Sequence, residues 1–344
     1  MSSRMFFNNH KGSEKGAVLL IVLILMALVA SIVADIIKAS RYDYSGAAYL
    51  KNSYVANTIL ESAADTTIAM FKDKVLGGTF TDFEKFRKNY SNILKTISGV
   101  MDAGELSGKI EDESSRLPIN MQSNSNSTKI KKVLVSLLFN LCEAHDFGSG
   151  DDTLDNANAY ANSILCWIGN GTLCNNDRDY YRSLDPEYGL SGKHIQSTDE
   201  LLLIRRPDNW LDDDEFMELY NGSGNIPGLK DLVTPYSKGP MNINTLKKEI
   251  VMALVPVDRS LDEKLDFYSD LNSARQGNNK AGWFSVFMQN QPAEYKKNLP
   301  ELSYGSDTVR VTIRYNKGIY NSSLMEIFNV SSSSNSVKYK KYGY

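Results

Sequence analysis

The chain has 344 residues, of which 42% are hydrophobic and 23% are charged, and its formal net charge is −3 at pH 7. This composition allows a sizeable folded core and excludes a typical polyanion-binding protein, because contacts to a phosphate backbone normally need an excess of lysine and arginine. We therefore expect no nucleic-acid partner. Beyond residue 78 the chain is long enough for one large or two ordinary domains, and we favour one domain with a second inserted into it.

Residues 17–34 form an unbroken apolar stretch, AVLLIVLILMALVASIVA, which contains no charged residue. As a helix, this stretch is just long enough to cross a hydrocarbon core roughly 30 Å thick. Arg4, Lys11 and Lys15 precede it and favour a cytoplasmic location for residues 1–16. The sequence therefore predicts a single-pass protein of the inner membrane with its C-terminal part in the periplasm.

A glycine lies at the junction between the charged leader and the apolar stretch, whereas an ordinary secretory signal has its small-residue cleavage site after the apolar region. A conventional site after Ala34 would have the bulky Ile32 where a small residue is preferred, which makes that alternative the weaker one. Cleavage between Gly16 and Ala17 would leave the apolar helix attached to the mature protein.

The Lys15-Gly16 pair before an apolar stretch resembles the class III leader of type IV pilins and pseudopilins. The resemblance implies cleavage between Gly16 and Ala17 by a prepilin peptidase, and methylation of the processed subunit. Most members of this family have Glu at the fifth mature position, where this sequence has Ile21. A buried carboxylate there would be neutralised by the α-amino group of a neighbouring subunit. Because Ile21 cannot make that pair, the sequence predicts a subunit that occupies the first, tip position.

The helix is expected to continue beyond the membrane, because residues 35–74 contain no proline and a single glycine, Gly46. Apolar residues recur in this region at the three- and four-residue spacing of an amphipathic helix: Val55, Ile59, Leu60, Ala63, Ala64, Ile68, Met70 and Phe71. We predict one stem helix over residues 17–74, stopped by Gly77 and Gly78. A membrane anchor followed by a separate bundle helix is the alternative that periodicity leaves open.

Residues 106–120 and 308–330 have the short apolar runs and turn residues of β-strands, and 308–315 is expected to pair with 324–330. Helical patterns occupy 129–142, 154–168, 197–203, 245–255 and 261–275. We predict an α+β fold with a leader at 1–16, a stem at 17–78, a sheet formed by 79–120 and 301–330, an inserted α-helical domain at 121–300, and a mobile tail at 331–344.

Four short segments resemble, in chain order, landmarks of the K-type minor pseudopilins of type II secretion: DESSRLPIN at 112–120, SLDPEY at 183–188, STDELLLIR at 197–205 and MNINT at 241–245. The resemblance implies a type IV pilin-like fold with a long stem, a small antiparallel sheet and a large inserted α-helical domain. It implies a non-enzymatic subunit at the pseudopilus tip, whose partners are the I- and J-type minor pseudopilins and exported proteins. A minor type IV pilin or a membrane-anchored periplasmic adhesin is the alternative.

The MNINT segment also suggests a helical hairpin that grips a phosphate backbone, but the neighbouring turns lack a basic cluster. We expect Asn242 and Asn244 to cap helices or turns instead. Cys142 and His145 are close in sequence, yet neither an orienting acid nor an oxyanion site accompanies them. We therefore expect a structural cysteine and a surface histidine, and no enzymatic activity.

K-type family members carry calcium in the insertion, bound through D-W-x-D-x-D and E-D-x-Y segments. The corresponding residues 166–171 keep the tryptophan without the carboxylates, which leaves Asp177, Asp179 and Asp185 as weak candidates for a calcium site. Calcium prefers roughly six to eight oxygen ligands, more than three carboxylates supply alone.

Cys166 and Cys174 bracket the same loop in a segment that we expect to be exported to an oxidising compartment. A disulfide between them would stabilise the fold by roughly 2 to 3 kcal/mol in the loop-entropy description. Cys142 would then be free or compete for pairing, and the sequence leaves the connectivity open.

Overall fold

The computed structural model describes residues 13–74, 80–101, 104–121, 125–171, 174–237, 239–277, 282–297, 299–318, 320–330 and 336–343. The chain divides into two compact units, Met1–Thr58 and Ile59–Tyr344. The boundary lies within helix α1 (Ser13–Lys74) and matches none of the domain limits predicted from the sequence. Most of the predicted leader, residues 1–12, lies outside the described residues.

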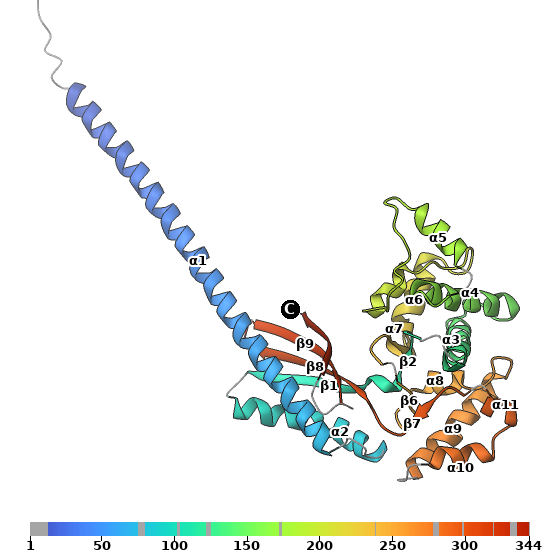
Figure 1. Ribbon diagram of the computed structural model, residues 1–344. Helices are drawn as coiled ribbons and strands as arrows, with labels where there is room; N and C mark the ends of the chain where they lie inside the picture. Colours follow the sequence, from blue (N-terminus) through green and yellow to red (C-terminus); the bar gives the residue numbers. More distant parts are fainter. Residues whose placement is uncertain are drawn as a thin grey trace, which may run out of the picture. The chain divides into compact units, whose positions relative to one another are not determined.

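Helix α1 is a single helix of 62 residues, which confirms the predicted long stem and excludes a separate anchor and bundle helix (Figure 1). The absence of proline from the segment allows this, because proline removes a backbone donor and clashes with the preceding turn. Helix α1 ends at Lys74. Gly77 and Gly78, predicted to stop it, lie outside the described residues.

The part of α1 that belongs to the second unit has an amphipathic face whose buried side chains include Leu60, Ala64 and Phe71. Helix α2 (Phe80–Val100) contacts this face: the ring of Phe71 lies 5.9 Å from that of Phe83 and 5.6 Å from that of Phe86. The expectation of a sheet over residues 79–120 is therefore wrong for residues 80–100. The physical reason is a helical repeat of large apolar residues in this segment, Phe83, Phe86, Tyr90, Ile93, Leu94 and Ile97.

Four antiparallel strands form a sheet in the order β1-β8-β9-β10, with bounds β1 (Glu105–Asp112), β8 (Thr308–Lys317), β9 (Tyr320–Asn329) and β10 (Ser336–Gly343). The predicted hairpin of the two long strands is confirmed, with Ile313 opposite Leu324. Alternation along β8 buries Val309, Val311 and Ile313 on one face of the sheet.

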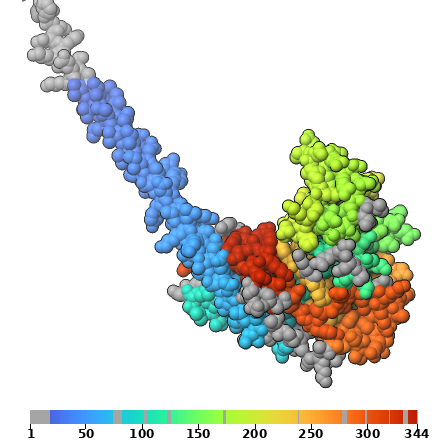
Figure 2. All heavy atoms as spheres, viewed as in Figure 1, coloured from blue at the N-terminus to red at the C-terminus, as the bar shows by residue number. Residues whose placement is uncertain are grey.

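Strand β10 corrects the prediction of a mobile tail at residues 331–344, because Ser336–Gly343 pairs with β9 along its length (Figure 1). Figure 2 shows the atoms of this C-terminal strand, in dark red, as a compact patch on the surface. Its lysines suggested a solvated tail, but they pair with acceptors at the sheet edge. Lys340 Nζ lies 3.2 Å from Glu326 Oε1 and 3.0 Å from Glu61 Oε1 of α1. Lys338 Nζ donates to Thr308 Oγ1 at 2.9 Å. Lysines on an edge strand are common because they discourage pairing with foreign strands.

The segment between β1 and β8 is mostly helical, which agrees with the predicted helical insertion (Figure 1). Its elements are η1 (Glu113–Ser115), β2 (Leu117–Pro118), α3 (Ser125–Ala144), α4 (Asp151–Trp167), α5 (Asn175–Arg182), η2 (Thr198–Leu203), α6 (Asp213–Asn221), β3 (Gly222–Ser223), β4 (Ile226–Pro227), α7 (Leu229–Leu232), β5 (Val233–Thr234), β6 (Met241–Asn242), α8 (Lys248–Ala253), α9 (Leu261–Gly277), α10 (Trp283–Gln289), α11 (Ala293–Lys297) and β7 (Leu302–Ser303).

A continuous apolar core joins these helices and includes fully buried side chains of α3 and α8, among them Leu134, Leu138 and Ile250. Two short parallel strand pairs hold the first and last parts of the insertion to its middle: β2 pairs with β5, and β7 pairs with β6. This arrangement positions the polar residues described next.

Candidate functional site

The first candidate region is the N-terminal apolar segment of α1. Its large apolar side chains from Val18 to Ile37 are exposed, and Ile21 is 56% exposed. Gly16 and Ala17 lie on the helical backbone of α1. Among the described residues, α1 is the one helix long and apolar enough to cross a membrane, and its most apolar window has no buried residue. An apolar surface of this extent fits a single-pass anchor in lipid or against partner helices.

The second candidate region is a buried polar junction, which we define as Asp112, Ser114, Asn242, Thr245 and Ser306. Asp112 ends β1 and caps η1, where its carboxylate accepts a hydrogen bond from Ser114 N at 2.8 Å. Its Oδ2 accepts from Asn242 Nδ2 at 2.9 Å, from Ser306 Oγ at 2.6 Å and from Thr245 Oγ1. The first residue of the 112–120 segment thus binds two residues of the 241–245 segment.

The electrostatics of the junction reflect the burial of its carboxylate, since Asp112 is 2% exposed. Burial raises the pKa of the Asp112 carboxyl, although the hydrogen bonds from Ser306, Thr245 and Asn242 counteract part of this effect. A buried carboxylate with several donors is costly to disrupt, because removal of the acceptor leaves each donor unsatisfied. The junction therefore holds the end of β1 against the insertion.

The expectation that Asn242 and Asn244 cap turns agrees with the structure, in which Asn242 Oδ1 accepts from Asn244 N at 3.1 Å. Asn244 continues the network: its Nδ2 donates to Tyr304 O at 2.7 Å, and its Oδ1 accepts from Trp283 Nε1 at 2.9 Å. The two asparagines connect β6 with α10 and with the chain that leads into β8.

A charged cluster, made of Glu111, Glu113, Arg116 and Arg310, lies beside the junction. Glu113 is 0% exposed, and its Oε1 contacts Arg310 Nε and lies 3.8 Å from Arg116 Nε. Arg116 Nη2 lies 3.5 Å from Glu111 Oε1. Burial is the largest single effect on the pKa of Glu111 and raises it, but the positive charges of Arg116, Lys109 and Arg310 together outweigh burial, so that this pKa is lowered. Ion pairs of this kind are costly to break by removing one partner, because the other charge stays buried.

Asn120, the last residue of the 112–120 segment, is also buried between chain segments. Its Nδ2 donates to Ile195 O and to Pro235 O, both at 2.8 Å, and its Oδ1 accepts from Ile195 N at 2.8 Å. In the 197–205 segment, Ser197 and Glu200 form a capping box at the start of η2. Each polar position named here thus has a local structural explanation.

The loop between α4 and α5 is closed by a disulfide between Cys166 and Cys174, with a Cα–Cα distance of 5.5 Å. Gly171 lies against it, and a Cβ atom at this position would lie 2.5 Å from Cys166 Sγ. Cys142 is free and buried, and burial raises the pKa of its thiol to about 12. The expectation of a surface histidine is wrong for His145, whose side chain is 1% exposed and whose Nδ1 lies 3.4 Å from Glu218 Oε1. Nothing in this arrangement activates the Cys142 thiol as a nucleophile.

The three carboxylates considered for calcium do not come together. Asp177 is 6% exposed and accepts from Ser163 Oγ at 3.0 Å, while Arg205 Nη1 lies 3.8 Å from its Oδ1. Asp179 and Asp185 are exposed. Within the described ranges, no group of three His, Cys, Asp or Glu side chains is arranged to hold a metal ion. The donor set does not fit calcium, because Arg205 already supplies the positive charge beside Asp177.

No family model and no curated protein matches the chain. In fold the chain is similar to a solved structure described as "The Crystal Structure of the GspK-GspI-GspJ complex from enterotoxigenic Escherichia coli Type 2 Secretion System". The TM-score is 0.51 at 15% identity, and the match covers 70% of this chain and 80% of the other. At this identity the likeness shows the fold. It confirms the predicted α+β class, with a long N-terminal helix, a small antiparallel sheet and further helices.

Sequence reasoning singled out the segments that contain Asp112, Asn120, Asn242 and Thr245 but assigned no contact between them. The structure shows that the 112–120 and 241–245 segments meet, and it adds Ser306, which no sequence signal marked. A serine after the short strand β7 carries no pattern of its own. The one hint in the sequence is Asp112 at the end of a predicted strand, because an aspartate that is buried there needs hydrogen-bond donors from elsewhere in the chain.

Proposed function

We propose that the chain is a non-enzymatic, K-type minor pseudopilin that occupies the tip of a type II secretion pseudopilus and supports export of proteins across the outer membrane. The observation that carries the proposal is a pseudopilin-like fold whose long stem helix, Ser13–Lys74, runs through the Gly16-Ala17 junction into an exposed apolar segment. The proposed location is the inner membrane, with the N-terminus cytoplasmic and the second unit periplasmic.

Processing is the first step of the proposed mechanism. A prepilin peptidase cuts between Gly16 and Ala17, and the apolar helix stays attached because it follows the cut. Extraction of this helix from lipid is costly unless neighbouring helices replace the lipid contacts. The exposed apolar side chains of α1 then pack against the stems of partner pseudopilins.

Ile21 determines the position of the subunit in the proposed assembly. A subunit with Glu at this position pairs its carboxylate with the α-amino group of a neighbour, which removes the cost of an unpaired buried charge. Ile21 has no carboxylate, so this subunit offers its own amine to the next subunit but cannot dock beneath one already in place. One-sided pairing of this kind suits the first subunit of a filament.

The inserted helical domain serves as the cap of the proposed tip. The junction and the charged cluster join β1 and β8 to the insertion through buried hydrogen bonds and ion pairs. The hydrogen bonds that Asp112 accepts from Asn242 and Ser306 rigidify the structure around this carboxylate. Force applied through the stem is therefore transmitted to the cap without a flexible linker at β1. The proposed lateral partners are I- and J-type pseudopilins.

Mass spectrometry of the membrane-derived chain tests the proposal. With an active prepilin peptidase, the mature chain should begin at Ala17, and Gly16→Leu should block the cut while the matched leader variant Gly12→Leu leaves it intact. The processed chain should then co-purify with I- and J-type pseudopilins. A chain that begins near Asp35, or that keeps Met1 despite active peptidase, contradicts the proposal. Association with pili or host surfaces in place of pseudopilins would favour a minor type IV pilin or an adhesin.

A further inference from the structure

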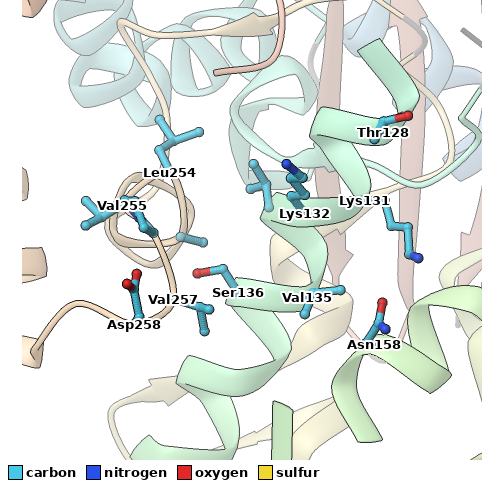
Figure 3. Close-up of a pocket in the computed structure, with 13 residues that line it drawn as sticks. Thr128, Lys131, Lys132, Val135, Ser136, Asn158, Leu254, Val255, Val257 and Asp258 are labelled. Carbon is cyan, nitrogen blue, oxygen red and sulfur yellow. The ribbon is translucent and has the colours of Figure 1, made fainter. Parts of the chain in front are cut away.

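A groove runs along α3, with Asn158 of α4 on one side and the segment that joins α8 to α9 on the other (Figure 3). Its cavity volume is about 430 Å³. Most of its lining is apolar and comes from Val133 and Val135 of α3 and from residues 253–257. The volume falls within the range of small-ligand sites, roughly 300–1,000 Å³, which suits a few residues of a peptide but no folded domain.

One buried polar group in the groove has no partner. Ser136 is 4% exposed, and its Oγ forms no hydrogen bond within the described part of the chain. Figure 3 shows this hydroxyl directed from α3 toward Val257 and Asp258, across the groove. A helical serine commonly bonds the carbonyl of the preceding turn, and Ser136 does not. A buried hydroxyl without a partner is unfavourable, so a ligand that supplies one would be stabilised by it.

A second group in the groove is an unpaired cation. Lys131 lines the groove, and no salt bridge involves it among the residues that the structure describes. Burial lowers the pKa of Lys131, and no neighbouring carboxylate offsets this effect. Figure 3 shows Lys131 on the same side of the groove as Asn158, whereas Asp258 lies on the opposite side. An ammonium group that is partly removed from water without a counter-ion gains from an anionic ligand.

These features together define the chemistry of the ligand. The apolar lining accepts an aliphatic side chain, and Lys131 accepts a carboxylate beside it. Ser136 and Asn158 can donate to peptide carbonyl groups, while Asp258 can accept from peptide N–H groups. An extended peptide has all of these groups within a few residues.

We propose that this groove binds an extended peptide segment in which an aliphatic residue neighbours an acidic one. The segment belongs to an exported protein that docks on the cap. This choice of protein rests on the proposed function. The charge complementarity between Lys131 and an acidic side chain selects the class of segment, and the apolar lining provides most of the buried area.

Fluorescence anisotropy of the full chain in nanodiscs of phosphatidylcholine tests the groove. The probe is a fluorescein-labelled peptide, Gly-Leu-Glu-Leu-Glu-Gly, and we expect saturable binding. Replacing its glutamates by lysine, or its leucines by serine, should weaken binding at least about tenfold, since each change removes one of the two matched features. Equal binding of the lysine peptide would overturn the proposal, as would no saturation below about 1 mM.

Matched variants locate the binding. Lys131→Glu should weaken binding at least about tenfold, whereas Lys129→Glu, the same change on the same helix outside the groove, should leave it within about twofold. Ser136→Ala should weaken binding by a smaller factor without lowering the melting temperature, because its hydroxyl has no partner to lose. Equal effects of the two lysine variants would overturn the assignment of the groove.

The groove and the proposed function fail separately. Lys131→Glu should still be processed at Gly16 and should still co-purify with the I- and J-type pseudopilins. Loss of peptide binding with intact assembly would therefore confirm the groove as a distinct site on a tip subunit. Peptide binding by a chain that the peptidase leaves uncut would keep the groove and refute the proposed function.

Discussion

Asn242 Nδ2 donates a hydrogen bond of 2.9 Å to Asp112 Oδ2, across a sequence separation of 130 residues. This bond connects the end of the first sheet strand with β6, which lies within the helical insertion. Thr245 and Ser306 donate to the same oxygen. Each of the segments 112–120 and 241–245 is a weak sequence signal by itself. The contact between them explains why both occur in this chain.

Replacement of Asp112 tests how much this feature contributes to stability. Asp112→Ala removes the carboxylate that accepts from Asn242, Thr245 and Ser306, although Asn242 Nδ2 keeps Ser306 Oγ as a second acceptor at 3.0 Å. Hydrogen bonds to a charged group contribute about 1.5 to 3 kcal/mol each, so we expect a loss of about 3 kcal/mol in the free energy of unfolding. Chemical denaturation followed by circular dichroism measures it. The exposed Asp155→Ala of α4 is the control, and a loss no larger than in this control would contradict the role of the junction.

The disulfide predicts a defined response to reduction. Cys166→Ser opens the loop that the Cys166–Cys174 bond closes, and we expect a loss of about 2 to 3 kcal/mol in the free energy of unfolding.

Because the carboxylates Asp177, Asp179 and Asp185 do not group together, chelation of calcium should leave stability unchanged. Parallel melting curves with dithiothreitol and with EDTA measure both effects. A melting temperature that falls with EDTA but not with dithiothreitol would reverse this interpretation.

Thiol counting gives an independent check on the cysteines. The chain has three cysteines, and the structure leaves Cys142 free and buried. Burial raises the pKa of the Cys142 thiol to about 12, so the folded protein should not react with a thiol reagent at pH 8. Denaturation without reductant should release one reactive thiol, and denaturation with reductant should release all three. A reactive thiol in the folded protein would contradict the burial of Cys142.

Lys247 predicts a pH dependence of stability. Burial and the neighbouring Arg116 lower its pKa to about 8, whereas an unfolded lysine has a value of 10.5. Between these two pH values the unfolded state binds more protons than the folded state, so stability increases as the pH rises through this window. The gain is at most about 3 kcal/mol. Lys247→Met should lack this gain, as urea denaturation from pH 7 to 10 would show. Parallel curves for the two proteins would contradict the lowered pKa.

The stem and the β8–β9 hairpin could be predicted from the sequence because each follows from local periodicity. Helix α2 is predictable as well, since Phe83 and Phe86 begin a helical repeat of buried apolar residues that differs from the alternation of the strand that follows. Strand β10 has lysines that suggest a solvated tail, and its pairing depends on β9 and on Glu61. The contact of Asp112 with Asn242 depends on the path of the entire insertion, which no local pattern determines.

In the proposed assembly, the position of the subunit in the filament depends on Ile21, which is exposed on the apolar segment of α1. Ile21→Glu introduces the carboxylate that pairs with a neighbouring α-amino group, and we expect this variant to enter positions below the tip. Quantitative mass spectrometry of purified pseudopili should then find more copies of this chain per filament than in the wild type, whereas Ile21→Leu, which restores no charge, should not change the copy number. The expected increase in copy number has a physical reason. The α-amino group of a neighbouring subunit is a buried charge that is costly when unpaired, and the carboxylate of Ile21→Glu would pair with it. An unchanged copy number for Ile21→Glu would mean that the cap, and not the missing carboxylate, confines the subunit to the tip.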